Sequence, residues 1–158
     1  MSNLSCSLLF SLGVLLVAPA ASIAGECSRD VTVKFVANDA DRARDWNVVY
    51  GRYVVRNDSK KPVEISAYKS EEQPVLLYPL SAFVEAKGDS GRWANDSTVI
   101  EHFEPPNLVF RVEPGEEKEF LASSRPDPEP LYRIRLRTTK KCWVTSEPFH
   151  FPARSVQP

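Results

Sequence analysis

The stretch LYRIRLRTTKKCWV, residues 131–144, decides the fold class because its apolar and basic residues alternate. Successive side chains of an extended strand point to opposite faces, so Tyr132, Ile134 and Leu136 would face a core. The opposite face would carry basic side chains, the arginine row. Its members are Arg133, Arg135 and Arg137. The following TTKK, residues 138–141, is typical of a hairpin connection.

The same alternation recurs along most of the chain, and sustained helical spacing of apolar residues is missing. The expected strands cover residues 31–36, 47–57, 62–70, 81–87, 107–113, 117–123, 131–138 and 142–151. Asn, Asp, Gly and Pro are frequent in the intervening segments and favour turns. Residues 38–45, NDADRARD, have the composition of a short helix. The sequence therefore predicts an all-β protein, a single antiparallel β-sandwich of about seven to eight strands.

The N-terminal segment has the pattern of an export signal. Residues 1–25 contain no Asp, Glu, Lys or Arg, and Leu8–Ala18 is an apolar run of signal-peptide length, followed by small residues. This pattern predicts a signal peptide at 1–24 and a domain at 25–158. We therefore expect an exported protein, periplasmic or extracellular, without stable membrane insertion after cleavage. An uncleaved anchor is the alternative, although membrane spans need about 20 apolar residues.

The number of cysteines also agrees with an exported protein. Cys6 lies in the expected signal peptide, which leaves Cys27 and Cys142 for the domain. Two cysteines in an exported chain have one intramolecular pairing, so we expect a disulfide that closes almost the whole domain into one loop. No CxxC motif is present, so the cysteines do not indicate a metal site. Lipidation of Cys27 is a minor alternative because Glu26 separates it from the preceding small residues.

A further pattern is carried by four segments: YVVRNDSKKPVEI, PGEEKEF, YRIRL and SEPFHF, within residues 31–151. They resemble strands of the immunoglobulin-like or fibronectin-like β-sandwich domains of exported proteins. This architectural resemblance implies adhesion, inhibition, chaperoning or another form of binding. Folds of this kind host many functions, so the resemblance does not identify a partner.

The arginine row supports two interpretations. Planar guanidinium groups bind carboxylates bidentately, so the row could dock an acidic protein. Alternatively, it is the solvated face of an ordinary strand, paired with acids on adjacent strands such as Glu64 and Glu147. Trp93 lies among loop-forming residues in GDSGRWAND and is a candidate interface anchor. Trp46 and Trp143 are expected in the core, with Trp143 packed against the disulfide.

Catalytic and metal-binding signals are weak. His102 and His150 are the only histidines, and no GxSxG, HExxH or Gly-rich phosphate loop occurs. Asp39, Asp41 and Asp45 lack the spacing of an EF-hand calcium loop. A net charge of −1 provides no general attraction for nucleic acid. We therefore expect no catalytic residues, no metal and no cofactor.

The sequence thus favours a non-catalytic binding module, not an enzyme, that recognises another protein through a sheet face or loop end. The identity of that protein is open, and an acidic one would suit the arginine row. The candidate contacts are Arg133, Arg135, Arg137 and Trp93. One alternative is an inhibitor or immunity-type protein that blocks a secreted enzyme with its Pro-rich loop, residues 125–130. The other is a small secreted hydrolase, which would need a histidine beside a Ser or a carboxylate.

Overall fold

The computed structural model describes residues 25–39, 49–69, 73–95, 104–124 and 131–152. These residues form strands, turns and irregular connections without a helix. The strands are β1 (Val31–Asp39), β2 (Val49–Asn57), β3 (Val63–Ala67), β4 (Val75–Leu76), β5 (Ala82–Lys87), β6 (Trp93–Asn95), β7 (Leu108–Val112), β8 (Glu117–Ser124), β9 (Tyr132–Arg137) and β10 (Trp143–Thr145). The predicted all-β fold is confirmed, and each expected strand overlaps one of these. The additional strands β4 and β6 have 2 and 3 residues, too few to show alternation.

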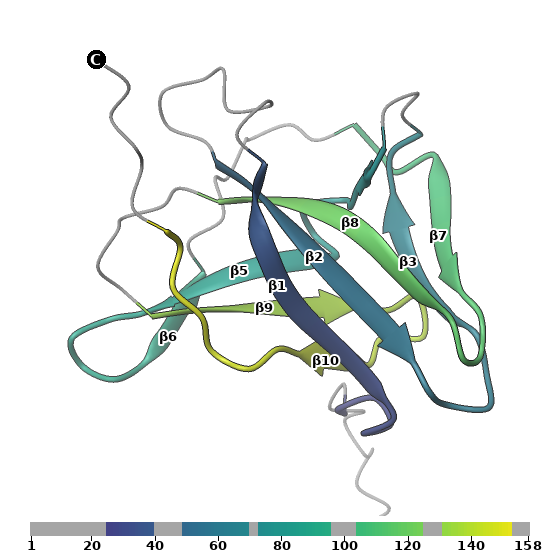
Figure 1. Ribbon diagram of the computed structural model, residues 1–158, viewed down its shortest axis with the longest axis horizontal. Helices are drawn as coiled ribbons and strands as arrows, with labels where there is room; N and C mark the ends of the chain where they lie inside the picture. The colour runs from purple at the N-terminus through teal and green to yellow at the C-terminus, as the bar shows by residue number, and fades with distance from the viewer. Residues whose placement is uncertain (1–24, 40–48, 70–72, 96–103, 125–130, 153–158) are drawn as a thin grey trace, which may run out of the picture.

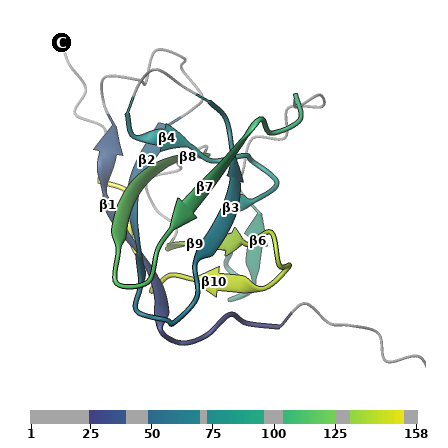
Figure 2. The same ribbon diagram turned by 90° about the vertical axis from the view of Figure 1, so that its right-hand side faces the viewer.

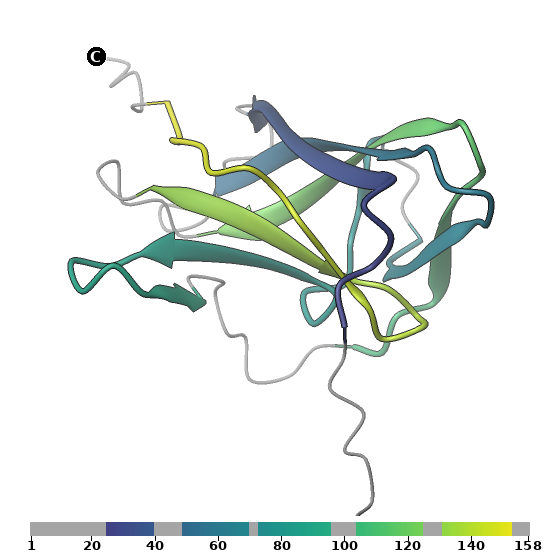
Figure 3. The same ribbon diagram turned by 90° about the horizontal axis from the view of Figure 1, so that it is seen from below.

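Two four-stranded sheets stack as the layers of a sandwich. Their strand orders are β1-β2-β8-β4 and β10-β9-β5-β6, and β3 and β7 form a separate pair beside them (Figure 1). Figure 3 shows the layers from below, with β1 and β2 in blue above β5 in teal and β9 in yellow-green. The strand pairs are antiparallel except β4–β8, which is parallel.

The core lies between the two sheets, where the alternating pattern places it. Tyr132, Ile134 and Leu136 of β9 are fully buried, as their spacing predicts. From the opposite sheet, Tyr53 and Phe120 stack with their ring centroids 5.5 Å apart. Full burial of a large apolar side chain stabilises a fold by about 1.5–3 kcal/mol, so each of these side chains contributes to stability on that scale.

Gly51 makes room for Tyr53 on the inner face of β2. A Cβ atom added at Gly51 would come within 2.6 Å of the Tyr53 hydroxyl oxygen. That hydroxyl is buried without a hydrogen-bond partner among the described residues, and burial raises its pKa. The ring therefore stabilises the core through its apolar contacts, while its unpaired hydroxyl opposes burial.

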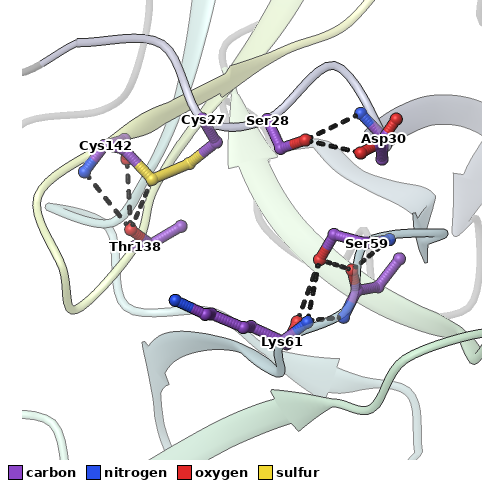
Figure 4. Close-up of a disulfide and its surroundings, with 8 residues drawn as sticks. Cys27, Ser28, Asp30, Ser59, Lys61, Thr138 and Cys142 are labelled. Atoms are coloured by element: carbon purple, nitrogen blue, oxygen red, sulfur yellow. Dashed lines mark hydrogen bonds between the residues drawn. A yellow bond between two sulfur atoms is a disulfide. The ribbon is translucent and has the colours of Figure 1, made fainter.

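The expected disulfide joins Cys27, ahead of β1, to Cys142, ahead of β10 (Figure 4). The two Cα atoms are 5.0 Å apart, and the sequence separation is 115. The backbone N–H of Cys27 also donates to the carbonyl oxygen of Trp143 at 2.7 Å. The bridge thus ties the start of the domain to its last strand. Such a bridge is consistent with the oxidising compartments that exported proteins reach.

Asn38 and Asp39 belong to β1, so the predicted helix over 38–45 is wrong at its start. They pair with Gly51 and Tyr50 of β2, and this cross-strand ladder extends the strand against the local helical composition. The remainder of that segment and the expected signal peptide, residues 1–24, lie outside the described residues. Within the described residues, no helix is long and apolar enough to cross a membrane.

Candidate functional site

The outer face of the β10-β9-β5-β6 sheet brings the arginine row together with aromatic and charged neighbours. We call this surface the arginine–tryptophan face. It consists of the arginine row with Phe83, Glu85, Lys87, Trp93 and Trp143. Strand register pairs Arg137 with Trp143 across β9–β10, and Arg133 with Glu85 across β9–β5. Because directly opposite side chains contact one another, these residues form one continuous surface.

One carboxylate, that of Glu85, binds two members of the arginine row. Arg133 donates from Nε to Oε2 of Glu85 at 2.6 Å, and Arg135 donates from a terminal nitrogen to Oε1 at 3.2 Å. The Glu85 side chain is 12% exposed, and the two arginine side chains are 24% and 28% exposed. The expected partner Glu64 is wrong, because it lies on β3 and binds Arg111 at 3.1 Å.

The guanidinium groups of the arginine row stack on the indole rings of two tryptophans. The Cζ atom of Arg133 lies 4.4 Å from the ring centroid of Trp93, and that of Arg135 lies 4.4 Å from the ring centroid of Trp143. Arg137 also lies over Trp143, at 5.9 Å. Cation–π contacts at exposed sites contribute about 0.5–1 kcal/mol each, so the stacking restricts where these arginines can point.

The two tryptophans lie differently from the sequence prediction. Trp143 was expected in the core, but it is half-buried on the outer face, beneath two arginines. Its position follows from the alternation of β10, in which Val144 takes the core position. Trp93 is half-buried and lies on β6, where its ring contacts Arg133 and also lies 5.9 Å from the Nζ atom of Lys87.

The arginine–tryptophan face carries an excess of positive charge. The arginine row and Lys87 provide cations, whereas Glu85 is the only carboxylate among the residues of this face. Arg137 is exposed, and no ion pair of it occurs within the described part of the chain. The charge balance of the opposite sheet is different. There one arginine, Arg52, binds one carboxylate, that of Glu119, at 2.6 Å.

The remaining candidate residues do not form a second site among the described residues. His150 is exposed, as its alternation with Phe149 and Phe151 predicts. Among the described residues, no group of three or more His, Cys, Asp or Glu side chains could hold a metal ion. His102, Trp46, Asp41, Asp45 and the Pro-rich loop at 125–130 lie outside the described residues.

Comparison with known proteins does not identify a family. No protein-family model matches the chain, and no curated protein matches it either. Among solved structures, it is similar to one described as Northeast Structural Genomics Consortium target SoR45. That similarity has 6% sequence identity and a TM-score of 0.35, and it covers 80% of this chain and 86% of the other.

Proposed function

We propose that this protein is an exported, non-catalytic binding module that docks an acidic segment of another protein on its arginine–tryptophan face. The observation that carries the proposal is the shared carboxylate of Glu85, which neutralises only part of the arginine row. The remaining guanidinium charge lies on the outer face of a sheet. Such a surface is complementary to carboxylates presented by a partner.

Preorganisation supports a binding role. Arg133 and Arg135 are each held by Glu85 and by an indole ring, so much of their side-chain freedom is already restricted. Ordering a flexible side chain on binding costs about 0.5–1.5 kcal/mol, and that cost is smaller for these arginines. A guanidinium group has five N–H donors, so Arg135 keeps donors for a partner after binding Glu85.

Export forms part of the proposal and rests on the uncharged, apolar start of the sequence and on the disulfide. N-terminal sequencing of the exported protein is expected to begin near Gly25. Recovery of an intact N-terminus at Met1 would instead support an uncleaved anchor.

An oligo-glutamate peptide provides a direct test of the docking face. Tryptophan fluorescence should change on binding because Trp93 and Trp143 lie under the arginines that the peptide would contact. Substituting Gln for every member of the arginine row should weaken binding by at least about tenfold, since hydrogen bonds to charged groups contribute about 1.5–3 kcal/mol each. Increasing salt should also weaken binding, because screening reduces the charge attraction.

The matched control replaces Arg52, Arg56 and Arg111 with Gln. These arginines lie outside the arginine–tryptophan face, and each already pairs with a carboxylate. The net charge changes equally in both triple variants, so a specific site predicts loss of binding in the first and retention in the second. Equal loss in both would assign the binding to general charge, and full binding by the first would exclude the face. Circular dichroism establishes that each variant is folded.

A further inference from the structure

A groove of about 640 Å³ lies between β7 and β8, on strands that do not belong to the arginine–tryptophan face. Val75, Val109, Phe110 and Lys118 are among the residues that line it. Figure 2 shows β7 and β8 diverging from their shared turn, with β4 at the open end. The volume falls within the range of about 300–1,000 Å³ that is typical of ligand sites.

The closed end of the groove is held by a buried asparagine. The side-chain amide of Asn57 donates to the carbonyl oxygens of Val112 at 3.0 Å and Lys61 at 2.9 Å. Within the turn itself, the N–H of Glu116 donates to the carbonyl oxygen of Glu113 at 3.0 Å. These bonds fix the end of β7 and the turn that leads into β8, so the groove is a preformed feature of the fold.

One long side of the groove is an unpaired edge of β7. β7 pairs with β3 along its other edge, and no second strand of the described residues pairs with it. The Nζ atom of Lys118 donates to the carbonyl oxygen of Arg111 at 2.6 Å, so this carbonyl points toward β8. Backbone directions repeat at every second residue of a strand, and the backbone groups of Val109 therefore point the same way.

The other long side is the facing edge of β8. β4 pairs with only Phe120 and Leu121 of β8, and the N–H of Leu77 donates to the carbonyl oxygen of Leu121 at 3.0 Å. By the same alternation, the backbone groups of Glu117 and Glu119 point away from β2 and toward the groove. A strand placed there would continue the line of β4 along β8.

The groove has apolar contacts and little unpaired charge. Phe110 and Val75 are buried, while Val109 is 52% exposed. At the rim, Arg52 and Glu119 neutralise each other at 2.6 Å. Unpaired backbone edges beside an apolar surface suit an extended peptide better than a charged ligand.

We propose that this groove binds an extended, uncharged segment of a partner protein as an added strand between β7 and β8. β7 has 5 residues, so a segment of about four to five residues matches its length at about 3.3 Å per residue. Apolar, β-branched residues at alternate positions cover Phe110 and Val75, and the peptide backbone bonds to the two edges. Both sides belong to this chain, so an occupant must lie between two strand edges of one molecule, which a linear segment fits better than a folded second copy.

The probe is the peptide acetyl-Val-Thr-Val-Thr-Val-amide, titrated into the full, disulfide-bonded protein and followed by NMR. The amide signals of Val109, Arg111, Glu117 and Glu119 are expected to shift, and those of the arginine–tryptophan face are not. The same peptide N-methylated at alternate residues should bind at least about tenfold more weakly, because it has lost the donors along one edge. Equal binding of the methylated and unmethylated peptides would overturn the proposal.

Two substitutions in the protein, each with a matched control, test which of its backbone groups bind the peptide. Lys118→Met frees the carbonyl oxygen of Arg111 and should tighten peptide binding, whereas Lys140→Met, on another turn, should leave it unchanged. Val109→Pro removes the donor that faces the groove and should weaken binding at least about tenfold, while Val109→Thr retains it.

Val109→Pro counts only if circular dichroism shows a native fold, and Lys118→Met tests the site independently of it. No binding by the wild type and by Lys118→Met at about 1 mM peptide would exclude the site. Sedimentation that shows a dimer dissociated by Val109→Pro would assign the groove to a second copy and overturn the partner proposal.

Discussion

Replacement of Glu85 by Gln is expected to lower the free energy of unfolding by about 2 kcal/mol. In the structure, one carboxylate oxygen accepts from Arg133 at 2.6 Å and the other accepts from Arg135 at 3.2 Å. Glutamine has the same shape but one acceptor oxygen, so its amide N–H₂ would meet the donors of the second guanidinium group. Hydrogen bonds to charged groups contribute about 1.5–3 kcal/mol, and Glu85 is only 12% exposed, so solvent replaces little of the loss.

Urea unfolding of the disulfide-bonded protein, followed by tryptophan fluorescence, measures this change. The matched control is Glu119→Gln, whose carboxylate binds Arg52 at 2.6 Å with side chains that are 43% and 41% exposed, respectively. Exposed ion pairs contribute about 0–1 kcal/mol, so the control should lose less than about 1 kcal/mol. Equal losses in the two variants would refute the premise that burial strengthens the contacts of Glu85.

The same substitution should act in the opposite direction on binding. Glu85→Gln removes the carboxylate of the arginine–tryptophan face, which raises the positive charge available to oligo-glutamate. Tighter peptide binding by a less stable protein is therefore expected, with circular dichroism at the assay temperature as the control for folding. Weaker binding would show that Glu85 is needed to position the arginines for the partner.

Other perturbations have clear signs. Serine at both Cys27 and Cys142 should lower the free energy of unfolding by about 2–5 kcal/mol in urea titrations, because the bridge closes a long loop in the unfolded chain. Tyr53→Phe should be neutral or stabilise by up to about 2 kcal/mol, since its buried hydroxyl has no partner among the described residues, and a lower urea midpoint would contradict this. A backbone N–H of the same turn and then Lys118 lower the pKa of Glu116 below its ordinary 4.5. Its stabilising contribution is therefore present above that value and lost as pH falls through the lowered pKa, so Glu116→Gln should flatten the stability–pH curve on the acid side of pH 4.5.

Much of the fold can be predicted from the sequence because its signals are local. A strand repeats every two residues, so YRIRLR alone places Tyr132, Ile134 and Leu136 in the core and the arginine row outside. The cysteine count likewise predicts the bridge between Cys27 and Cys142. The likeness to immunoglobulin-like domains remains a prediction, since the similarity at a TM-score of 0.35 does not bear on it.

The partners of the arginine row could not be predicted, because they depend on strand order. The pattern of SAFVEAK places Glu85 on an outward face, but nothing local shows that β5 pairs with β9. Glu64 has an equally outward position on β3, and topology brings it to Arg111 instead. Trp143 was misplaced because its neighbour in sequence, Cys142, suggested burial against the disulfide, whereas the register of β10 directs it outward.

The two proposed surfaces differ in the part of the chain that would recognise a partner. On the arginine–tryptophan face, recognition uses side-chain charge, which is visible in sequence and weakens as salt screens it. In the β7–β8 groove, recognition uses backbone N–H and C=O groups of Val109, Arg111, Glu117 and Glu119, which any sequence possesses and only the topology exposes. Because hydrogen bonds and apolar contacts in a groove with paired rim charges respond little to screening, the salt dependence of binding distinguishes the two surfaces. A partner that engages both would show a salt-sensitive component abolished by Gln substitution of the arginine row and a salt-insensitive component abolished by Val109→Pro.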